Sequence, residues 1–518
     1  MRAKQILSAI PLFAIASCQV DCEIEQRPNI ILIYADDLGK GMLSSYGQQQ
    51  LTTPNIDKIV NHGVKFNNAY SSAYSAPARF SLLTGYNDCR NDKYIISRGG
   101  PYNVLDTMLI APREDSIYMR TPRFEANDLH LAQVFGAAGY KSCAIGKLEW
   151  GFLSTRRQMD ERGWDEYYGF LDHNRCHGYY PAFIFHNGEI ELIEGNTHAN
   201  AFVVANDGTP DDDYDRRWDM SGRTKFSEDL FIEQAEEFIA NNRNQPFFLY
   251  YASQLPHGPV CTPDIDPELA ANSLLTQYEK EYGSMIKHLD SSVGRIFKAL
   301  EKNGLEENTM VIFMADNGHS ILYNSQGRCS NGKDALMDGR TVDHYEVNYT
   351  SQAGGDVFNG NGGTSGLKRS SLDGGVNVPF AVYWKGHLTS RNEDELIVSY
   401  DILPTFADML GVELETQKCG VSFKDVLMNG AKLNSNRTIV IDSQNIGPMI
   451  ARNDGWKLRY VYPFKCYQLF NLNDDPMEQC DLIDKYPEIA NELAKKLNAE
   501  CSVGYNGESF ASGELILE

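Results

Sequence analysis

The sequence predicts an α/β fold: a doubly wound, mixed but mostly parallel sheet flanked by helices, followed by a smaller C-terminal α+β domain built on a short antiparallel sheet. Three observations predict it. Short, almost continuously apolar runs lie at Asn29–Ala35, 246–251 and Thr309–Ala315, with a weaker run at 140–145. Helical patterns separate these runs. After about residue 425 the pattern changes to short alternating runs.

Each kind of run has its own structural meaning. Strands that are apolar on both faces belong to parallel sheets covered by helices. In the clearest helical pattern, apolar residues recur at three- and four-residue spacing from Ile286 to Leu300, and Asn303-Gly304 ends it. Alternation of such strands and helices is typical of doubly wound folds. The alternating runs at 437–442 and 456–462 predict the strands of the C-terminal domain.

Composition and charge exclude several classes of protein. The 518 residues are 42% hydrophobic and 23% charged, which excludes collagen-like, coiled-coil and largely disordered chains. The formal net charge is −23, so the chain would repel nucleic acid or a long polyanion at a distance. We therefore expect no nucleic-acid partner. A small anion can still bind where a few local cations outweigh the overall field.

The N-terminus predicts export. Residues 1–4 are basic and residues 6–16 are apolar, a run too short for a membrane span of about 20 residues. Ile15-Ala16-Ser17-Cys18 resembles a bacterial lipobox, which predicts lipidation of Cys18. We expect a signal peptide at 1–17, a linker at 18–27, a large domain at 28–425 and a C-terminal subdomain at 426–518. An ordinary secretory signal, with Cys18 incidental, is the alternative.

Eleven cysteines are scattered through the chain, and none forms a CxxC pair. The cysteine spacing therefore excludes a zinc ribbon and a thioredoxin-like redox motif. An exported chain can form disulfides among the cysteines other than a lipidated Cys18, but the sequence does not say which ones pair. The alternative is that many are buried thiols that behave as small hydrophobic residues.

Polar residues follow the predicted strands at the points where those strands end. These residues are Asp36, Asp37, Lys147, His257, Asp316 and Asn317. Ligands of open α/β sheets bind outside the carboxyl ends of the strands, so these groups should converge on one edge. The carboxylate and amide oxygens suit Ca²⁺ or Mg²⁺ rather than zinc. The alternative is that one aspartate caps a helix and the others are solvated.

The most specific segment spans residues 75–85, Ser-Ala-Pro-Ala-Arg-Phe-Ser-Leu-Leu-Thr-Gly. Pro77 near the start and Gly85 at the end predict a helix between them. Ser75 would then lie at the helix N-terminus, where backbone N–H groups stabilise an oxyanion. Arg79 is four residues on and projects from the same face toward Ser75.

This segment resembles the signature of the type I sulfatases of the alkaline-phosphatase superfamily, Cys/Ser-x-Pro-Ser/Ala-Arg-x-x-x-x-Thr-Gly. Further motifs follow in the family's order, and the resemblance covers most of the chain. They lie at residues 29–39, 53–57, 139–147, 256–257, 315–318, 374–379 and 469–476. The resemblance implies an alkaline-phosphatase-like fold, a sulfuric ester hydrolase, and a catalytic domain at 28–425.

The resemblance also implies roles for individual residues. A maturase would oxidise Ser75 to formylglycine, whose hydrate attacks sulfur. One Ca²⁺ would be bound by the Ser75-derived oxygen and by Asp36, Asp37, Asp316 and Asn317. Arg79 and Lys147 would hold the formylglycine, and Lys368, which follows a Gly-rich loop at 351–367, would neutralise sulfate charge. His257 would bind sulfate and protonate the leaving sugar oxygen.

One position departs from the family. The family commonly has Gly-Lys-x-His after the strand at 140–145, and this chain has Gly146-Lys147-Leu148-Glu149. Glu149 therefore replaces a histidine that contacts formylglycine. Its carboxylate could serve as the base that collapses the hydrate, but it would repel sulfate. His319 is the candidate to take over the missing histidine's role.

The segment at 172–181 resembles the substrate loop of bacterial sulfatases that act on sulfated galactose and N-acetylgalactosamine. Within it, His177 could bind the axial hydroxyl at O4 of galactose; the alternative is a packed His/Tyr turn. We expect an exo-acting sulfatase for 3-O-sulfated galactose of host-type glycans such as mucin O-glycans. Sulfate at the 6- or 4-position is the second choice. A phosphatase or phosphonate hydrolase, or a silent glycan-binding lipoprotein, is a further alternative.

Overall fold

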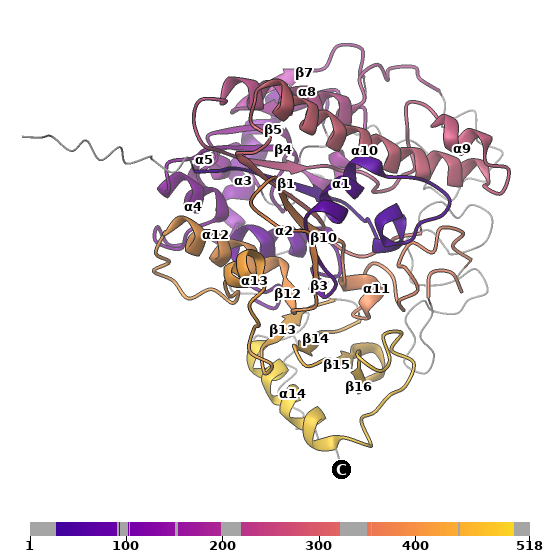
Figure 1. Ribbon diagram of the computed structural model, residues 1–518. Coiled ribbons are helices and arrows are strands. Elements are labelled where there is room, and N and C mark those ends of the chain that lie inside the picture. The colour runs from indigo at the N-terminus through magenta and orange to yellow at the C-terminus, as the bar shows by residue number, and fades with distance from the viewer. Residues whose placement is uncertain are drawn as a thin grey trace, which may run out of the picture.

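The protein is described by a computed structural model that covers residues 27–90, 93, 102, 104–150, 154–197, 219–321, 350–353, 355–443 and 446–501 (Figure 1). The predicted signal peptide and Cys18 lie outside these residues. Within them, no helix has both the length and the apolar character needed to cross a membrane.

The described residues form a ten-stranded sheet in the order β11-β2-β10-β9-β1-β8-β4-β5-β6-β7. Its centre is parallel and consists of β9 (Thr309–Ala315), β1 (Asn29–Ala35), β8 (Phe247–Ala252), β4 (Lys141–Lys147) and β5 (Glu166–Phe170). Towards the edges, β10 (Phe380–Trp384), β6 (Phe183–His186) and β7 (Glu189–Leu192) pair antiparallel. The outermost pair, β2 (Val64–Phe66) and β11 (Arg391–Glu393), is parallel. The predicted mixed, mostly parallel sheet is confirmed.

Two groups of helices cover the sheet (Figure 1). In one group, α10 (Gln277–Lys302) contacts α1 (Pro54–His62) and α8 (Ser227–Asn241). In the other, α12 (Ile402–Leu410) contacts α2 (Ser75–Thr84) and α4 (Leu131–Ala137). The other helices of this part are α3 (Ile110–Arg120), α5 (Arg156–Glu161), α6 (His173–Cys176), α9 (Pro267–Ala271), α11 (Asp373–Val376) and α13 (Lys424–Asn429). A separate parallel pair joins β3 (Ala69–Tyr70) to β12 (Ile397–Val398).

The elements form where the sequence patterns predict them. The strands predicted at Asn29–Ala35 and Thr309–Ala315 have these bounds in the structure. The helix predicted around Ile286 begins earlier, because Thr276 and Glu279 form a capping box. It ends at the predicted point: Asn303 is the C-cap, and Gly304 follows with a φ of 68°.

The C-terminal part forms its own antiparallel sheet, as predicted. Its strands are β13 (Thr438–Ile441), β14 (Met449–Arg452), β15 (Trp456–Val461) and β16 (Cys466–Asn471). The helix α14 (Pro487–Glu500) packs on this sheet and buries Leu493 and Leu497 against Leu458 and Leu469. Figure 1 shows this unit below the large sheet. The domain boundary at 425/426 stays a prediction.

A buried ion network joins the two parts. Lys457 of β15 is fully buried, and its Nζ lies 2.7 Å from Asp373 Oδ1 and 2.8 Å from Glu478 Oε1. Asp373 opens α11, which belongs to the large domain. Because a buried lysine is stable only when its charge is compensated, these two carboxylates fix the C-terminal sheet against α11.

Candidate active site

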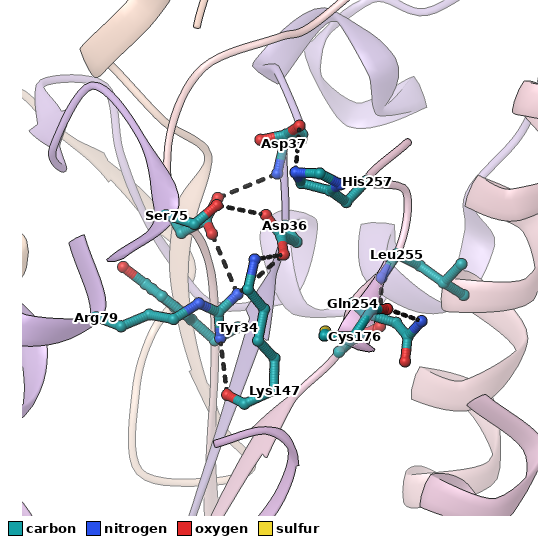
Figure 2. A network of polar contacts seen from close by, with 12 residues as sticks. Tyr34, Asp36, Asp37, Ser75, Arg79, Lys147, Cys176, Gln254, Leu255 and His257 are labelled. Carbon is teal, nitrogen blue, oxygen red and sulfur yellow. Dashed lines mark hydrogen bonds and ion pairs between the residues drawn. The ribbon is translucent and has the colours of Figure 1, made fainter. Parts of the chain in front are cut away.

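Ser75 lies at the start of α2, as the sequence predicts. Tyr74 is extended, with φ −164° and ψ 169°, and Gly85 ends the helix with a φ of 74° in the left-handed region. Every residue of α2 is buried. The Ser75 Oγ donates a hydrogen bond of 2.8 Å to Asp36 Oδ1, at the carboxyl end of β1 (Figure 2). The helix N-terminus therefore brings the hydroxyl to the edge of the sheet.

Two cations neutralise Asp36 (Figure 2). The Lys147 Nζ makes a close ion pair with Asp36 Oδ2, and Arg79 Nη2 lies 3.5 Å from the same oxygen. The three side chains are at most 1% exposed. Burial acts to raise the pKa of Asp36, but the charges of Lys147 and Arg79 hold this pKa well below its usual value. Asp36 is therefore ionised.

Arg79 also contacts a second carboxylate, Asp316, and two tyrosine side chains. Its Nη2 lies 3.1 Å from Asp316 Oδ2, and its Nη1 donates to the Lys147 carbonyl and the Tyr250 Oη, each at 3.3 Å. Its guanidinium lies over the Tyr34 ring, 5.2 Å from the centroid. Arg79 is thus fixed from four sides, with its charge directed at Asp36 and Asp316.

The predicted metal ligands converge. The Asp37 amide donates to Asp316 Oδ1 at 3.0 Å, and Asn317 Nδ2 donates to Asp37 Oδ1 at 2.9 Å. Burial and the charge of Asp36 raise the pKa of Asp316 to about 7. Asp36, Asp37 and His257 offer ligand atoms that all lie within 4.8 Å of one another.

These residues fit a hard cation. The Asn317 Oδ1 is buried and accepts no hydrogen bond among the described residues. A buried carbonyl oxygen without a donor is costly, and a cation would satisfy it. Bound Ca²⁺ would also stabilise the Asp316 charge that burial disfavours. The oxygen donors of Asp36, Asp37, Asp316 and Asn317 would hold such an ion.

Lys368 and His257 contact each other beside Asp37. The Lys368 Nζ lies 2.7 Å from Asp37 Oδ1 and 3.1 Å from His257 Nε2. His257 Nδ1 lies 2.5 Å from the Gly258 carbonyl, so Nδ1 carries its hydrogen and Nε2 faces the site. Burial and the Lys368 charge lower the pKa of His257 well below its usual value. The pair presents a cation and an imidazole to an anion.

His177 lies directly on His257. The two rings stack with centroids 3.9 Å apart and planes 9° apart. The His177 Nε2 is buried and has no hydrogen-bond partner among the described residues. Burial and the nearby His257 lower the pKa of His177, which keeps the imidazole neutral. The predicted substrate loop therefore reaches the same site.

The comparisons with known proteins agree with this geometry. The family model described as Sulfatase matches residues 28–412, about three quarters of the chain. The chain belongs to the sulfatase family. It is thus a sulfuric ester hydrolase.

Relatives of this sulfatase match most of its length. It is 25% identical to the N-acetylgalactosamine-6-O-sulfatase of Bacteroides thetaiotaomicron, over 92% of this chain and 93% of the relative. It is 28% identical to human arylsulfatase A, over 76% of this chain and 66% of the relative. Its fold matches the crystal structure of Ps i-CgsB in complex with k-i-k-neocarrahexaose with a TM-score of 0.68 and 23% identity, covering 94% and 95% of the two chains. The predicted family and the alkaline-phosphatase-like fold are confirmed.

Glu149 and His319, which were predicted to lie at the substrate, make contacts with other side chains of this sulfatase. Glu149 bonds to Arg162 in a close ion pair and accepts from Trp164 Nε1 at 3.2 Å and Ser154 Oγ at 3.3 Å. Arg162 therefore compensates the carboxylate that would repel sulfate. A catalytic role for Glu149 stays a prediction.

His319 is fully buried, and its Nε2 lies 3.4 Å from Asp356 Oδ2. Its backbone N–H donates to Asn361 Oδ1 at 3.0 Å, which fixes His319 against the loop at 351–367. Its carbonyl accepts the Lys368 N–H at 2.8 Å. These contacts support an indirect role, in which His319 places Lys368. Its predicted contact with substrate stays a prediction.

Sequence reasoning missed the aromatic residues that hold Arg79. Tyr34 and Tyr250 lie inside β1 and β8, where the sequence shows only the apolar pattern of buried strands. It also missed Arg162, which lies just after α5. Of these missed residues, only Arg162 could have been anticipated, because a buried Glu149 needs a cation nearby to compensate its charge.

Proposed function

We propose that this protein is an exo-acting carbohydrate sulfatase whose nucleophile derives from Ser75. The observation that supports it best is the hydrogen bond from Ser75 at the N-terminus of α2 to Asp36, with Arg79 and Lys147 on the other Asp36 oxygen. Position 75 is thereby placed at the focus of a buried, highly charged cluster.

Oxidation of Ser75 would supply the reactive group. A serine hydroxyl is a weak nucleophile. A maturase would remove two hydrogens from the side chain and leave formylglycine, whose hydrate offers one oxygen to attack sulfur and a second to expel sulfate afterwards. Ca²⁺ would lower the pKa of that hydrate and polarise a sulfate oxygen.

The side chains of this protein would compensate charge, bind the sulfate and supply a proton. Arg79 and Lys147 hold the group at position 75 and compensate charge that develops on it. Lys368 binds the transferred sulfate together with His257. Because His257 Nδ1 is committed to the Gly258 carbonyl, Nε2 is the atom that would carry the proton to the leaving sugar oxygen. The negative charge of the bound sulfate ester would raise the low pKa of this imidazole and favour its protonated form.

The proposed substrate is a terminal galacto-configured sugar sulfated at O6. The named activity of the full-length Bacteroides relative, N-acetylgalactosamine-6-O-sulfatase, supports this position of the ester. The His177 Nε2 beside His257, which has no hydrogen-bond partner in the part of the chain that the structure describes, supports a hydrogen bond to the axial O4 hydroxyl. That hydroxyl is common to 3-O-sulfated galactose, the substrate that the sequence analysis favours and that we keep as the second candidate. The 4-O-sulfated sugars lack it.

Two experiments test the proposal. Peptide mass spectrometry of the protein from its native host should show residue 75 lighter than serine by two hydrogens; serine throughout would support a silent glycan-binding lipoprotein instead. Kinetics on 6-O-sulfated N-acetylgalactosamine, 3-O- and 4-O-sulfated galactose, 6-O-sulfated N-acetylglucosamine and a phosphate monoester would rank the substrates. Faster turnover of the phosphate ester would refute the sulfatase assignment at this site.

We also propose that the protein is exported as a periplasmic or cell-surface lipoprotein, held at the membrane through Cys18. Cell fractionation of wild type and Cys18→Ala tests this. The wild type should fractionate with membranes and the variant should be released. An unchanged membrane association of Cys18→Ala would contradict the anchor.

A further inference from the structure

Two cysteines that are far apart in the sequence meet at the junction of the two domains. Cys89 lies five residues after α2, and Cys501 is the C-cap of α14. They are 412 positions apart in the sequence, yet their Sγ atoms lie 2.8 Å apart. Among the cysteines that the structure describes, this is the pair whose sulfur atoms are in contact.

The thiols are buried inside the C-terminal domain. Cys89 and Cys501 are 5% and 4% exposed and lie in one apolar cluster with Ile450, Leu458 and Leu493. Cys89 comes from the large domain, so its side chain crosses into the core of the smaller one. Buried thiols with apolar neighbours would be inert if left reduced, because the contact with Cys501, together with burial, raises the pKa of Cys89.

Contacts on either side hold the backbone segments in place. Asn87 Nδ2 donates to Glu500 Oε2 at 3.0 Å. Asp88 Oδ1 accepts from the Asp442 amide at 2.8 Å. Residues next to both cysteines are therefore already docked, and the sulfur atoms need to approach by only about 0.8 Å to reach the bond length of about 2.05 Å.

We propose that Cys89 and Cys501 form a disulfide in the exported protein, which ties the segment after the Ser75 helix to the last helix. Both S–H bonds break and one S–S bond forms, with loss of two electrons and two protons. The acceptor is a protein disulfide of the oxidising compartment, which is reduced to a dithiol by thiol–disulfide exchange. The bond forms before the junction closes, while the thiols are accessible.

The disulfide would close a loop that contains all residues between Cys89 and Cys501, which is most of the chain. A disulfide limits the freedom of the unfolded chain, and the effect grows with the length of the loop. The cross-link should therefore stabilise the junction between the domains more than any of the weak polar contacts beside it. It needs no contact with the Ser75 site, so it is independent of the proposed substrate.

A peptide map without reduction tests the pairing directly. The exported protein is denatured in excess alkylating reagent and digested with trypsin. The peptides at 80–90 and 497–518 each contain one cysteine, Cys89 or Cys501. They should appear joined, at the sum of their masses less two hydrogens. The buried Cys143 of β4 is the control and should be fully alkylated. Alkylated Cys89 and Cys501, or Cys501 joined to Cys419, would overturn the proposal.

Thermal unfolding separates the cross-link from packing. Cys89→Ser and Cys501→Ser should each lower the Tm by about 2–5 °C. A reducing agent should lower the wild-type Tm by a similar amount and leave both variants unchanged. Cys143→Ser, the control, should keep its response to the reductant. A wild-type Tm that does not respond to reductant would contradict the disulfide.

Discussion

Lys147→Ala and Lys368→Ala remove positive charge from two sides of the carboxylate cluster, and the structure predicts different costs for them. The Lys147 side chain is 1% exposed and pairs with the fully buried Asp36. The Lys368 side chain is 15% exposed and pairs with Asp37 at 2.7 Å. Water can reach the place of Lys368 and partly replace its charge, but it cannot reach the place of Lys147.

The stability costs follow from this burial. Removing one partner of a buried ion pair costs about 3–5 kcal/mol, because the other charge is left uncompensated. Lys147→Ala should cost about 3 kcal/mol, at the low end, since Arg79 remains 3.5 Å from Asp36. Lys368→Ala should cost less, about 1–2 kcal/mol, because water can reach the place of Lys368 although its partner Asp37 is buried. The buried position of Lys147 thus adds a folding cost that the sequence alone does not predict.

The effect on turnover should be large for both. Each lysine is assigned to charge that develops in the transition state, and losing one such contact lowers kcat by about 100- to 1000-fold. The assay is turnover of each variant on the best sulfated sugar, after mass spectrometry has shown equal conversion of Ser75. Urea unfolding of the same samples gives the free energies of unfolding.

Lys385→Ala is the matched control. This lysine is 42% exposed and pairs with Glu306 and Glu307. Its loss should change neither kcat nor stability appreciably. Near-normal turnover by both site variants would refute their catalytic roles. Equal destabilisation by Lys147→Ala and Lys368→Ala would refute the argument from burial.

Three further predictions concern the metal, the substrate and pH. A chelator should lower the Tm and abolish turnover, and Ca²⁺ should restore both; full restoration by Zn²⁺ but none by Ca²⁺ would contradict the oxygen ligand set. His177→Ala should lower kcat/KM on sulfated galacto sugars by about 10- to 100-fold, because a hydrogen bond to O4 is lost. The preference for these sugars over sulfated glucosamine should become smaller. An unchanged preference would show that His177 only packs against its neighbours. Burial raises the pKa of Glu478 to about 7, above its usual value of 4.5. The folded state then binds a proton more tightly than the unfolded state, so stability should fall as pH rises from about 5 to 8. Glu478→Gln, which cannot ionise, should lose less, and equal pH slopes in urea unfolding would show that Glu478 does not titrate there.

Much of the fold follows from local sequence patterns. β1 and β9 are continuous apolar runs, and a strand buried on both faces needs no other signal. The convergence of Asp36 and Asp316 also follows, because both come directly after neighbouring parallel strands, and β1 pairs with β9 in register up to Ala35 and Ala315. Topology alone brings these carboxylates together.

The partners of individual polar groups could not be predicted. Glu149 stands where the family has a histidine, and the sequence does not show that its charge is compensated by Arg162, 13 positions later. The same holds for His319, which lies two residues after the predicted metal ligand Asn317 but pairs with Asp356. Such contacts depend on how loops return to the sheet edge, and loops carry no periodic pattern that would fix their path.

The C-terminal sheet supports the active site through a path that no motif marks. Lys457 of β15 fixes Asp373 at the start of α11, and two residues later the Gly375 carbonyl accepts the Gly318 N–H at 2.8 Å. Gly318 follows the predicted metal ligand Asn317, and a Cβ on it would lie 1.9 Å from the Gly374 carbonyl oxygen, so only glycine permits this approach. A buried charge in the small domain therefore holds the backbone beside Asn317. Because a displaced ligand costs binding even when every ligand is present, the position of the C-terminal domain is part of the geometry of the site.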